Sequence, residues 1–228
     1  LLIIPRAIWK TIFTLNFILG LIILYPAFFI LLSRKEWYPK AFVLMKCWAR
    51  WILLGGLIGV SIKRKISKNK IPSPCVFVSN HVSYLDIVMS YVVIPDYFVF
   101  TGKQELNKAP LFRIFFKGMN ILVDRKSKMA SHKAYMRANE EVDKGHSIFL
   151  FPEATINTWG QLMPFKNGAF KLAIDKQIPI VPIIYLNNWT ILQNGGFFTS
   201  TGKPGISKAI MHKPVDTKGM TDADLLSL

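Results

Sequence analysis

A histidine and an aspartate stand five residues apart where an apolar run of the chain gives way to a polar one. His81 and Asp86 follow residues 75–79, a run typical of a buried strand, and Asp86 begins a segment that has the pattern of a helix. A neutral imidazole can take a proton from an alcohol, and a carboxylate on its other ring nitrogen fixes the tautomer and stabilises the imidazolium. The pair is therefore a candidate general base with its carboxylate partner. Taken alone, a polar turn in which His81 only bonds the backbone is the simpler alternative.

Further motifs follow apolar runs later in the chain. Residues 118–125 read Gly-Met-Asn-Ile-Leu-Val-Asp-Arg, and residues 151–155 read Phe-Pro-Glu-Ala-Thr. Residues 165–168 read Phe-Lys-Asn-Gly, and residues 180–183 read Ile-Val-Pro-Ile. In this order and at these spacings, the motifs resemble those of the glycerolipid and lysophospholipid acyltransferase family, which includes bacterial 1-acylglycerol-3-phosphate acyltransferases. The resemblance implies transfer of a fatty acyl chain from a thioester to a hydroxyl group.

The resemblance also implies a role for each motif. His81 would remove the proton of the acceptor hydroxyl, with Asp86 behind it. The other candidates are backbone donors to the tetrahedral oxyanion, contacts to the acceptor, and walls of an acyl groove. They are Gly102 and Lys103 for the oxyanion, Arg125, Glu153, Thr155 and Lys166 for the acceptor, and Val181 and Pro182 for the groove. Plainer interpretations stay open: a surface lysine at 103, a helix cap at 155 and core strand residues at 181 and 182.

The third motif departs from the family pattern at two positions. Ala154 replaces the usual glycine, and Ile156 stands where the family usually has arginine. The first change adds a methyl group. The second removes a guanidinium, the group best suited to a bidentate grip on phosphate. The departure therefore bears on the acceptor substrate and leaves the reaction type as it is.

Charge and composition point to a partner that is both anionic and apolar. The 228 residues carry a formal net charge of +16, and 51% of them are hydrophobic. An anionic membrane and the thioester of an acyl carrier protein or coenzyme A fit both properties. Nucleic acid is the alternative for such a basic chain, but no nucleic-acid-binding motif is present. Cys47 and Cys75 lack paired spacing and the four histidines form no zinc pattern, so we expect reduced thiols, no metal, no cofactor and a cytoplasmic catalytic domain.

Residues 1–62 are expected to attach the chain to a membrane. Residues 11–32 carry no charge and would form a helix about 33 Å long, enough to span a bilayer. Residues 41–62 carry two basic residues one turn apart, which suits a helix lying in the membrane interface. The resemblance favours a two-helix motif that dips into one leaflet; a spanning first helix and a soluble helix pair are the alternatives. Residues 63–74 would form a basic linker that contacts anionic headgroups at the cytoplasmic face of the inner membrane.

Residues 75–228 are expected to form the catalytic domain, in which strands and helices alternate. Strands are predicted over 75–79, 97–101, 119–123, 147–151 and 179–186, with a late strand within 207–215. Helices are predicted over 84–93, 105–117 with an interruption at Pro110, 128–144 and 167–176. This alternation predicts an α/β fold whose central sheet is mixed, mainly parallel and flanked by helices.

Together these features predict a membrane-associated O-acyltransferase. The leading acceptor is 1-acylglycerol-3-phosphate, which would give phosphatidic acid. A non-phosphate lysolipid, such as a lyso-aminolipid, is the alternative within this class. A hypothesis of another class is a non-catalytic membrane-binding protein that keeps the fold, and the presence of both His81 and Asp86 argues against it.

Overall fold

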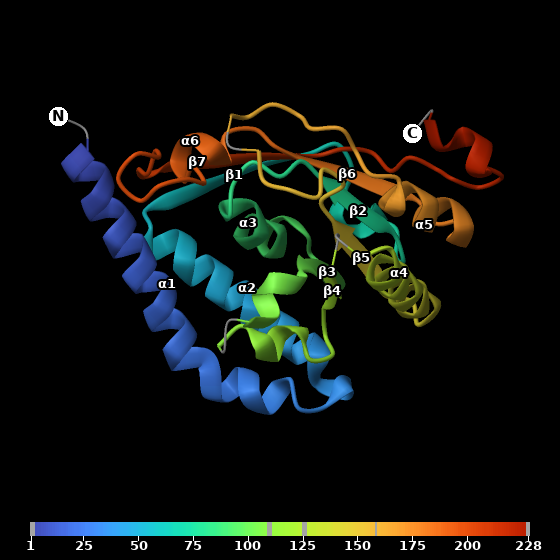
Figure 1. The fold of residues 1–228 in the computed structure, drawn as a ribbon, viewed down its shortest axis with the longest axis horizontal. Coiled ribbons are helices and arrows are strands. Elements are labelled where there is room, and N and C mark those ends of the chain that lie inside the picture. The colour runs from blue at the N-terminus through green and yellow to red at the C-terminus, as the bar shows by residue number, and fades with distance from the viewer. Residues whose placement is uncertain (1–2, 109–110, 125–126, 158, 227–228) are drawn as a thin grey trace.

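A mixed sheet organises the computed structural model, which describes residues 3–108, 111–124, 127–157 and 159–226. Within these residues the sheet has seven strands in the order β1-β7-β6-β2-β5-β3-β4 (Figure 1). The strands are β1 Ile58–Arg64, β2 Val76–Ser79, β3 Phe98–Lys103, β4 Ile121–Val123, β5 Ser147–Leu150, β6 Ile180–Tyr185 and β7 Gly205–Met211. Strands β6, β2, β5, β3 and β4 run parallel to one another. Strand β7 is antiparallel to β6 and parallel to β1, so the predicted mixed, mainly parallel sheet is confirmed.

Helices cover both faces of this sheet, as the apolar strands require. The helices are α1 Ile3–Leu31, α2 Tyr38–Gly55, α3 Leu85–Val93, α4 Lys128–Asp143, α5 Gly168–Lys176 and α6 Asn188–Ile191. Successive residues of β2 point to opposite faces of the sheet. Phe77 belongs to the core on the face that α1, α2 and α3 cover, whereas Val76 and Val78 belong to the core on the face that α4 and α5 cover. A strand that is buried on both faces has a continuous run of apolar residues, and residues 75–79 show this pattern in the sequence.

The elements predicted between residues 75 and 186 are largely confirmed, with ends that differ by at most two residues. The exception is the segment 105–117, which forms two short 3-10 helices at Gln104–Lys108 and Arg113–Phe116. Gly145 follows α4 with φ of +84° and donates its N–H to the carbonyl of Val142, so this helix ends in a conformation that favours glycine. The late strand begins at Gly205 and ends at Met211; Val215 only bridges to Ile180.

The predicted helix over residues 41–62 is wrong beyond Gly55. Strand β1 follows α2 after a turn in which Leu57 has φ of +53°, and it pairs in parallel with β7 over its full length. Ile58, Val60 and Ile62 alternate with other residues, a pattern that suits a strand. The helix prediction ran too far because a short apolar segment directly after a helix does not show where the helix ends. The basic run therefore starts inside a strand, and Arg64 Nη2 donates to the carbonyl of Val93 at 3.0 Å. The division of the chain at residues 62 and 75 stays a prediction.

Helix α1 has one side against the protein and one side exposed. Trp9, Leu21 and Phe28 are buried in the same core as α2 and the sheet. The exposed side carries a stripe of large apolar residues: Ile4, Ile8, Ile12, Leu15, Leu19, Ile22, Phe29 and Ile30. Among the described residues, α1 is the one helix long and apolar enough to cross a membrane, judged by length and composition only.

Candidate active site

The side chains of His81 and Asp86 lie together at the carboxyl end of β2. The loop after β2 carries His81, and the first turn of α3 carries Asp86, so the sequence order strand, loop, helix brings them within reach. Nδ1 of His81 lies 3.1 Å from Oδ2 of Asp86. A carboxylate can only accept, so Nδ1 carries the proton and Nε2 is left as the basic nitrogen.

The Asp86 carboxylate is fully buried, with both oxygens used. Oδ2 also accepts the backbone N–H groups of Val82 at 2.7 Å and Ser83 at 2.8 Å. Oδ1 accepts from Nδ2 of Asn188 at 2.7 Å. These hydrogen bonds fix the carboxylate beside the imidazole, where it can stabilise an imidazolium at His81. The turn 81–86 is thus built around the aspartate.

Asn188 and Ser207 extend the dyad, and sequence reasoning missed both. Asn188 opens the short helix α6 after β6, and its Oδ1 accepts from Oγ of Ser207 on β7 at 2.5 Å. Both residues are completely buried. A buried amide that has a partner on each side holds one orientation. Asn188 is 102 positions from Asp86, and no local pattern marks it.

The ring of His81 is fixed from its face as well as its edge. It stacks on Phe151, with ring centroids 3.8 Å apart and planes 5° from parallel. Only 8% of His81 is exposed, and within the described part of the chain Nε2 has no hydrogen-bond partner. A buried base with a free lone pair is suited to accept a proton from a bound alcohol.

Glu153 holds the His81 loop instead of facing an open acceptor site. Its side chain is buried, Oε1 accepts the backbone N–H of His81 at 2.8 Å, and Oε2 accepts the backbone N–H of Met163 at 2.9 Å. The backbone N–H of Asn157 donates to the carbonyl of His81 at 2.8 Å. The loop after β5 is therefore bonded to both backbone groups of the candidate base.

Ala154 sits where this loop turns back, with φ of +62°. Its N–H donates to the carbonyl of Phe151 at 3.0 Å, closing the turn. Residues with a Cβ are strained in the left-handed region, whereas glycine is not. The replacement of the family's usual glycine thus affects the backbone, beyond the added methyl group that the sequence indicated.

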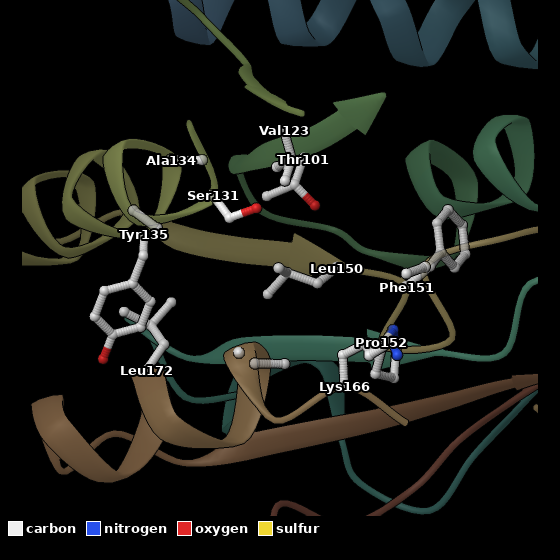
Figure 2. A pocket seen from close by; sticks show the side chains of 14 residues that line it. Thr101, Val123, Ser131, Ala134, Tyr135, Leu150, Phe151, Pro152, Lys166 and Leu172 are labelled. Atoms are coloured by element: carbon white, nitrogen blue, oxygen red, sulfur yellow. The ribbon is translucent and has the colours of Figure 1, made fainter. Parts of the chain in front are cut away.

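A mostly apolar pocket of about 340 Å³ has Phe151 among its lining residues, and His81 is not one of them. It lies between α4, α5 and the strands β3, β4 and β5, and Phe151 stands at one end of it (Figure 2). In Figure 2 the Lys166 side chain lies beside Pro152 near that end, and Tyr135 and Leu172 lie at the other. Phe151 therefore contacts His81 and also lines the pocket.

Two of the other predicted acceptor residues, Thr155 and Lys166, lie on the loop between β5 and α5. Lys166 is exposed and lines the pocket. Thr155 is exposed, and it does not cap α5, whose N-cap is Asn167. Ile156 is half-buried beside it. Arg125 lies outside the described residues.

The predicted oxyanion and groove residues are not in contact with the dyad. Gly102 and Lys103 end β3, which is separated from β2 by β5. A Cβ at Gly102 would lie 2.5 Å from the ring of Phe116, so packing alone requires a glycine there. Lys103 is exposed and pairs with Glu105 at 3.6 Å. Val181 is fully buried in the core of β6, and Pro182, next to it, is half-buried; neither lines the pocket.

Burial sets the chemistry of two other groups near β2. It raises the pKa of the Cys75 thiol to about 12, so this thiol stays protonated at neutral pH. It also raises the pKa of Tyr185, whose hydroxyl lies 2.8 Å from Oγ of Ser90. Across the described residues, no three His, Cys, Asp or Glu side chains are grouped so that they could hold a metal ion.

Comparison with known proteins gives consistent matches. A sequence profile of the Acyltransferase family matches residues 60–186. The 1-acyl-sn-glycerol-3-phosphate acyltransferase beta of Homo sapiens is 34% identical over 159 residues, which is 68% of this chain and 55% of that protein. The 1-acyl-sn-glycerol-3-phosphate acyltransferase of Haemophilus influenzae is 34% identical over 154 residues, 62% of this chain and 64% of that protein. The chain thus spans about half to two thirds of these curated relatives.

The fold has a solved counterpart. The crystal structure of the 1-acyl-sn-glycerophosphate (LPA) acyltransferase PlsC from Thermotoga maritima is similar with a TM-score of 0.78. The match covers 97% of this chain and 91% of that chain, at 20% sequence identity. At that identity the likeness concerns the fold, including the packing of α1 and α2 on the sheet domain.

Proposed function

This chain belongs to the Acyltransferase family, and from that premise we propose that it moves a fatty acyl chain from a thioester to the hydroxyl of a lysolipid. The observation that carries the proposal is the position of Phe151, which stacks on His81 and lines the apolar pocket. A lipid chain in that pocket would reach the residue on which the His81 ring stacks. Relatives named as 1-acyl-sn-glycerol-3-phosphate acyltransferases support 1-acylglycerol-3-phosphate as the acceptor, with phosphatidic acid as the product.

The reaction is proton abstraction coupled to acyl transfer. Nε2 of His81 takes the proton of the acceptor hydroxyl as its oxygen attacks the thioester carbonyl. The tetrahedral intermediate then collapses with cleavage of the carbon–sulfur bond, and the imidazolium returns the proton to the thiolate. Asp86 keeps Nδ1 protonated and stabilises the positive charge that forms on the ring.

We assign the oxyanion to backbone N–H groups at Gly102 and Lys103, as the sequence predicts. Their position at the carboxyl end of β3, on the same sheet edge as the end of β2, supports this assignment. Loss of one such donor typically lowers turnover by ~10²–10³. The acyl thioester can come from an acyl carrier protein or from coenzyme A.

The acceptor headgroup is assigned to Lys166, Arg125 and Thr155, as the sequence predicts. Exposure of Lys166 at the pocket edge supports a contact with phosphate. For Glu153 we propose an indirect role, in which it holds the loop that carries the acceptor residues. Both its carboxylate oxygens already accept hydrogen bonds from backbone N–H groups. The sequence-based acyl groove at Val181 and Pro182 stays a proposal, and the pocket beside Phe151 is the alternative place for the acyl chain.

We propose further that α1 and α2 seat the enzyme in one leaflet of an anionic membrane, with the active site on the cytoplasmic side. Helix α1 is held to the rest of the chain near both ends: Nε1 of Trp9 donates to the carbonyl of Gly56, and Phe28 packs edge-on against Phe115 at 4.9 Å. This docking and the exposed apolar stripe of α1 support insertion into one leaflet.

An acyl-transfer assay with the purified chain tests the proposed function. Lysophosphatidic acid, lysophosphatidylcholine and a lyso-aminolipid are offered in turn with acyl carrier protein or coenzyme A thioesters, and products are read by mass spectrometry. We expect phosphatidic acid to dominate, with no product from His81→Ala. Absence of transfer to every acceptor would instead favour a non-catalytic membrane-binding protein.

A further inference from the structure

The loop between α6 and β7 carries two exposed phenylalanines at its tip. Leu192 and Gly202 bridge at its base, and the rings of Phe197 and Phe198 contact each other edge-on at 5.2 Å. Phe198 is 63% exposed and Phe197 44%. The Lys10 ammonium lies 5.8 Å from the centroid of the Phe197 ring. Two adjacent large aromatic side chains that are exposed to this extent are unusual on a surface that serves only solubility.

The loop is fastened to the first half of α1. The ammonium of Lys10 donates to the carbonyl of Phe197 at 2.8 Å and to Oγ of Ser200 at 2.8 Å, and it also bonds the carbonyl of Ser200. Gly202 leaves room for the Lys10 stem, because a Cβ there would lie 2.5 Å from it. Figure 1 shows the loop, in orange-red, beside the N-terminal half of α1. The tip therefore cannot move independently of the helix that carries the apolar stripe.

The other end of the loop reaches the active site. The carbonyl of Leu192 accepts from Oγ of Ser83 at 2.5 Å, and Ser83 donates its backbone N–H to Asp86. Helix α6, which leads into the loop, supplies Asn188 to the same carboxylate. One short segment thus connects α1 with the partner of the catalytic base.

We propose that the 192–202 loop is a second membrane-contact element, in which Phe197 and Phe198 enter the headgroup–acyl boundary of an anionic bilayer beside α1. Charge and continuity identify the partner as lipid: the chain carries a net charge of +16, Arg6 and the exposed Lys203 flank the contact, and the tip adjoins a helix with an apolar stripe. When Phe197 and Phe198 enter the membrane, the loop becomes ordered. Because Leu192 and Asn188 connect this loop to Asp86, the same contact also orders that side of the active site. This inference rests on the proposed membrane location and adds to it a specific contact.

Site-specific labelling tests the contact without depending on turnover. In a Cys47→Ser background, an environment-sensitive fluorophore is attached at Phe198→Cys, at Leu15→Cys on α1, or at Met129→Cys on α4; Cys75 is fully buried and does not react. Vesicles of phosphatidylcholine and phosphatidylglycerol are then added. We expect blue-shifted emission and quenching by brominated lipid at positions 198 and 15, and no change at position 129, where the native side chain is even more exposed.

The outcomes separate this proposal from the one on which it rests. A label at 198 that stays aqueous while the label at 15 enters the bilayer overturns the loop contact and leaves the membrane location standing. Labels that stay aqueous at both positions overturn both.

Activity provides a second, independent measurement. For Phe197→Ser/Phe198→Ser we expect the ratio of turnover on vesicle-borne acceptor to turnover on detergent-dispersed acceptor to fall about tenfold, because two large apolar side chains no longer leave water on binding. Met129→Ser removes an exposed apolar side chain on α4 and should leave that ratio unchanged. An unchanged ratio in the double variant would contradict the membrane contact of the loop. Loss of all transfer in the parent protein would instead count against the proposed function.

Discussion

Nδ2 of Asn188 donates to Oδ1 of Asp86 at 2.7 Å, so the partner of the candidate base is held by a residue from a different strand–helix unit. The other oxygen of Asp86 is shared between His81 and two backbone N–H groups. A carboxylate bonded on both oxygens cannot rotate away from the imidazole. We therefore regard Asn188 as a positioning residue for the His81–Asp86 pair.

Replacing Asn188 by leucine should lower kcat by about tenfold to a hundredfold while leaving KM nearly unchanged, because a lost hydrogen bond to a charged group costs ~1.5–3 kcal/mol. Ser207→Ala removes only the next group along and should have a smaller effect. Steady-state kinetics across pH would show the difference. Wild-type kcat in a folded Asn188→Leu protein would show that Asp86 needs no such support.

Much of this site follows from local sequence, but its supports do not. The strand, loop and helix around His81 and Asp86 are contiguous, so their spacing made the pair a candidate, and the later motifs favoured it over a simple polar turn. Asn188 reaches Asp86 across 102 positions, and strand β1 gains its place only by pairing with β7. Such contacts depend on how distant elements are arranged, which one sequence does not reveal. The backbone partners of Glu153 are equally invisible, because every residue except proline offers the same N–H.

The dyad itself makes the most direct prediction. His81→Ala should abolish nearly all acyl transfer with the fold intact, because Nε2 is the proposed base. Asp86→Asn should lower turnover by up to ~10⁴, since an amide can hold the wrong tautomer of the imidazole. Product formation followed by mass spectrometry, with circular dichroism as the folding control, measures both. Substantial transfer by His81→Ala would require a different base.

A substitution at Glu153 distinguishes a role in positioning the His81 loop from a role in binding the acceptor. Glu153→Gln keeps one carbonyl oxygen but turns an amide N–H toward a backbone N–H, so one of the two bonds to His81 and Met163 is lost. If the residue positions the His81 loop, kcat should fall at least tenfold with little change in KM for the acceptor. A rise in KM with kcat preserved would return Glu153 to direct acceptor binding.

Ala154 predicts a gain in stability. Its φ of +62° is strained for a residue with a Cβ, and glycine would relieve ~1 kcal/mol even after its greater chain entropy is counted. For a chain of this size that corresponds to a rise in Tm of roughly 2–4 °C. Calorimetry of Ala154→Gly measures it, with Ala130→Gly in the first turn of α4 as a control expected to lower Tm. A Tm lowered equally by both changes would show that no strain is stored at residue 154.

Ile156 tests which headgroup the site prefers. The arginine usual at this position would add a charge-assisted contact worth ~1.5–3 kcal/mol, or roughly tenfold to over a hundredfold in affinity. Ile156 is half-buried on the loop that leads to Lys166, so a longer cationic side chain there can extend toward the pocket edge. Ile156→Arg should therefore raise kcat/KM for lysophosphatidic acid and lower it for a zwitterionic or uncharged lysolipid. Ile156→Gln, which adds length without charge, is the matched control and should leave the ratio of the two activities near that of the parent chain. If Ile156→Arg also leaves that ratio unchanged, this position does not contact the headgroup, and recognition of phosphate rests on other residues.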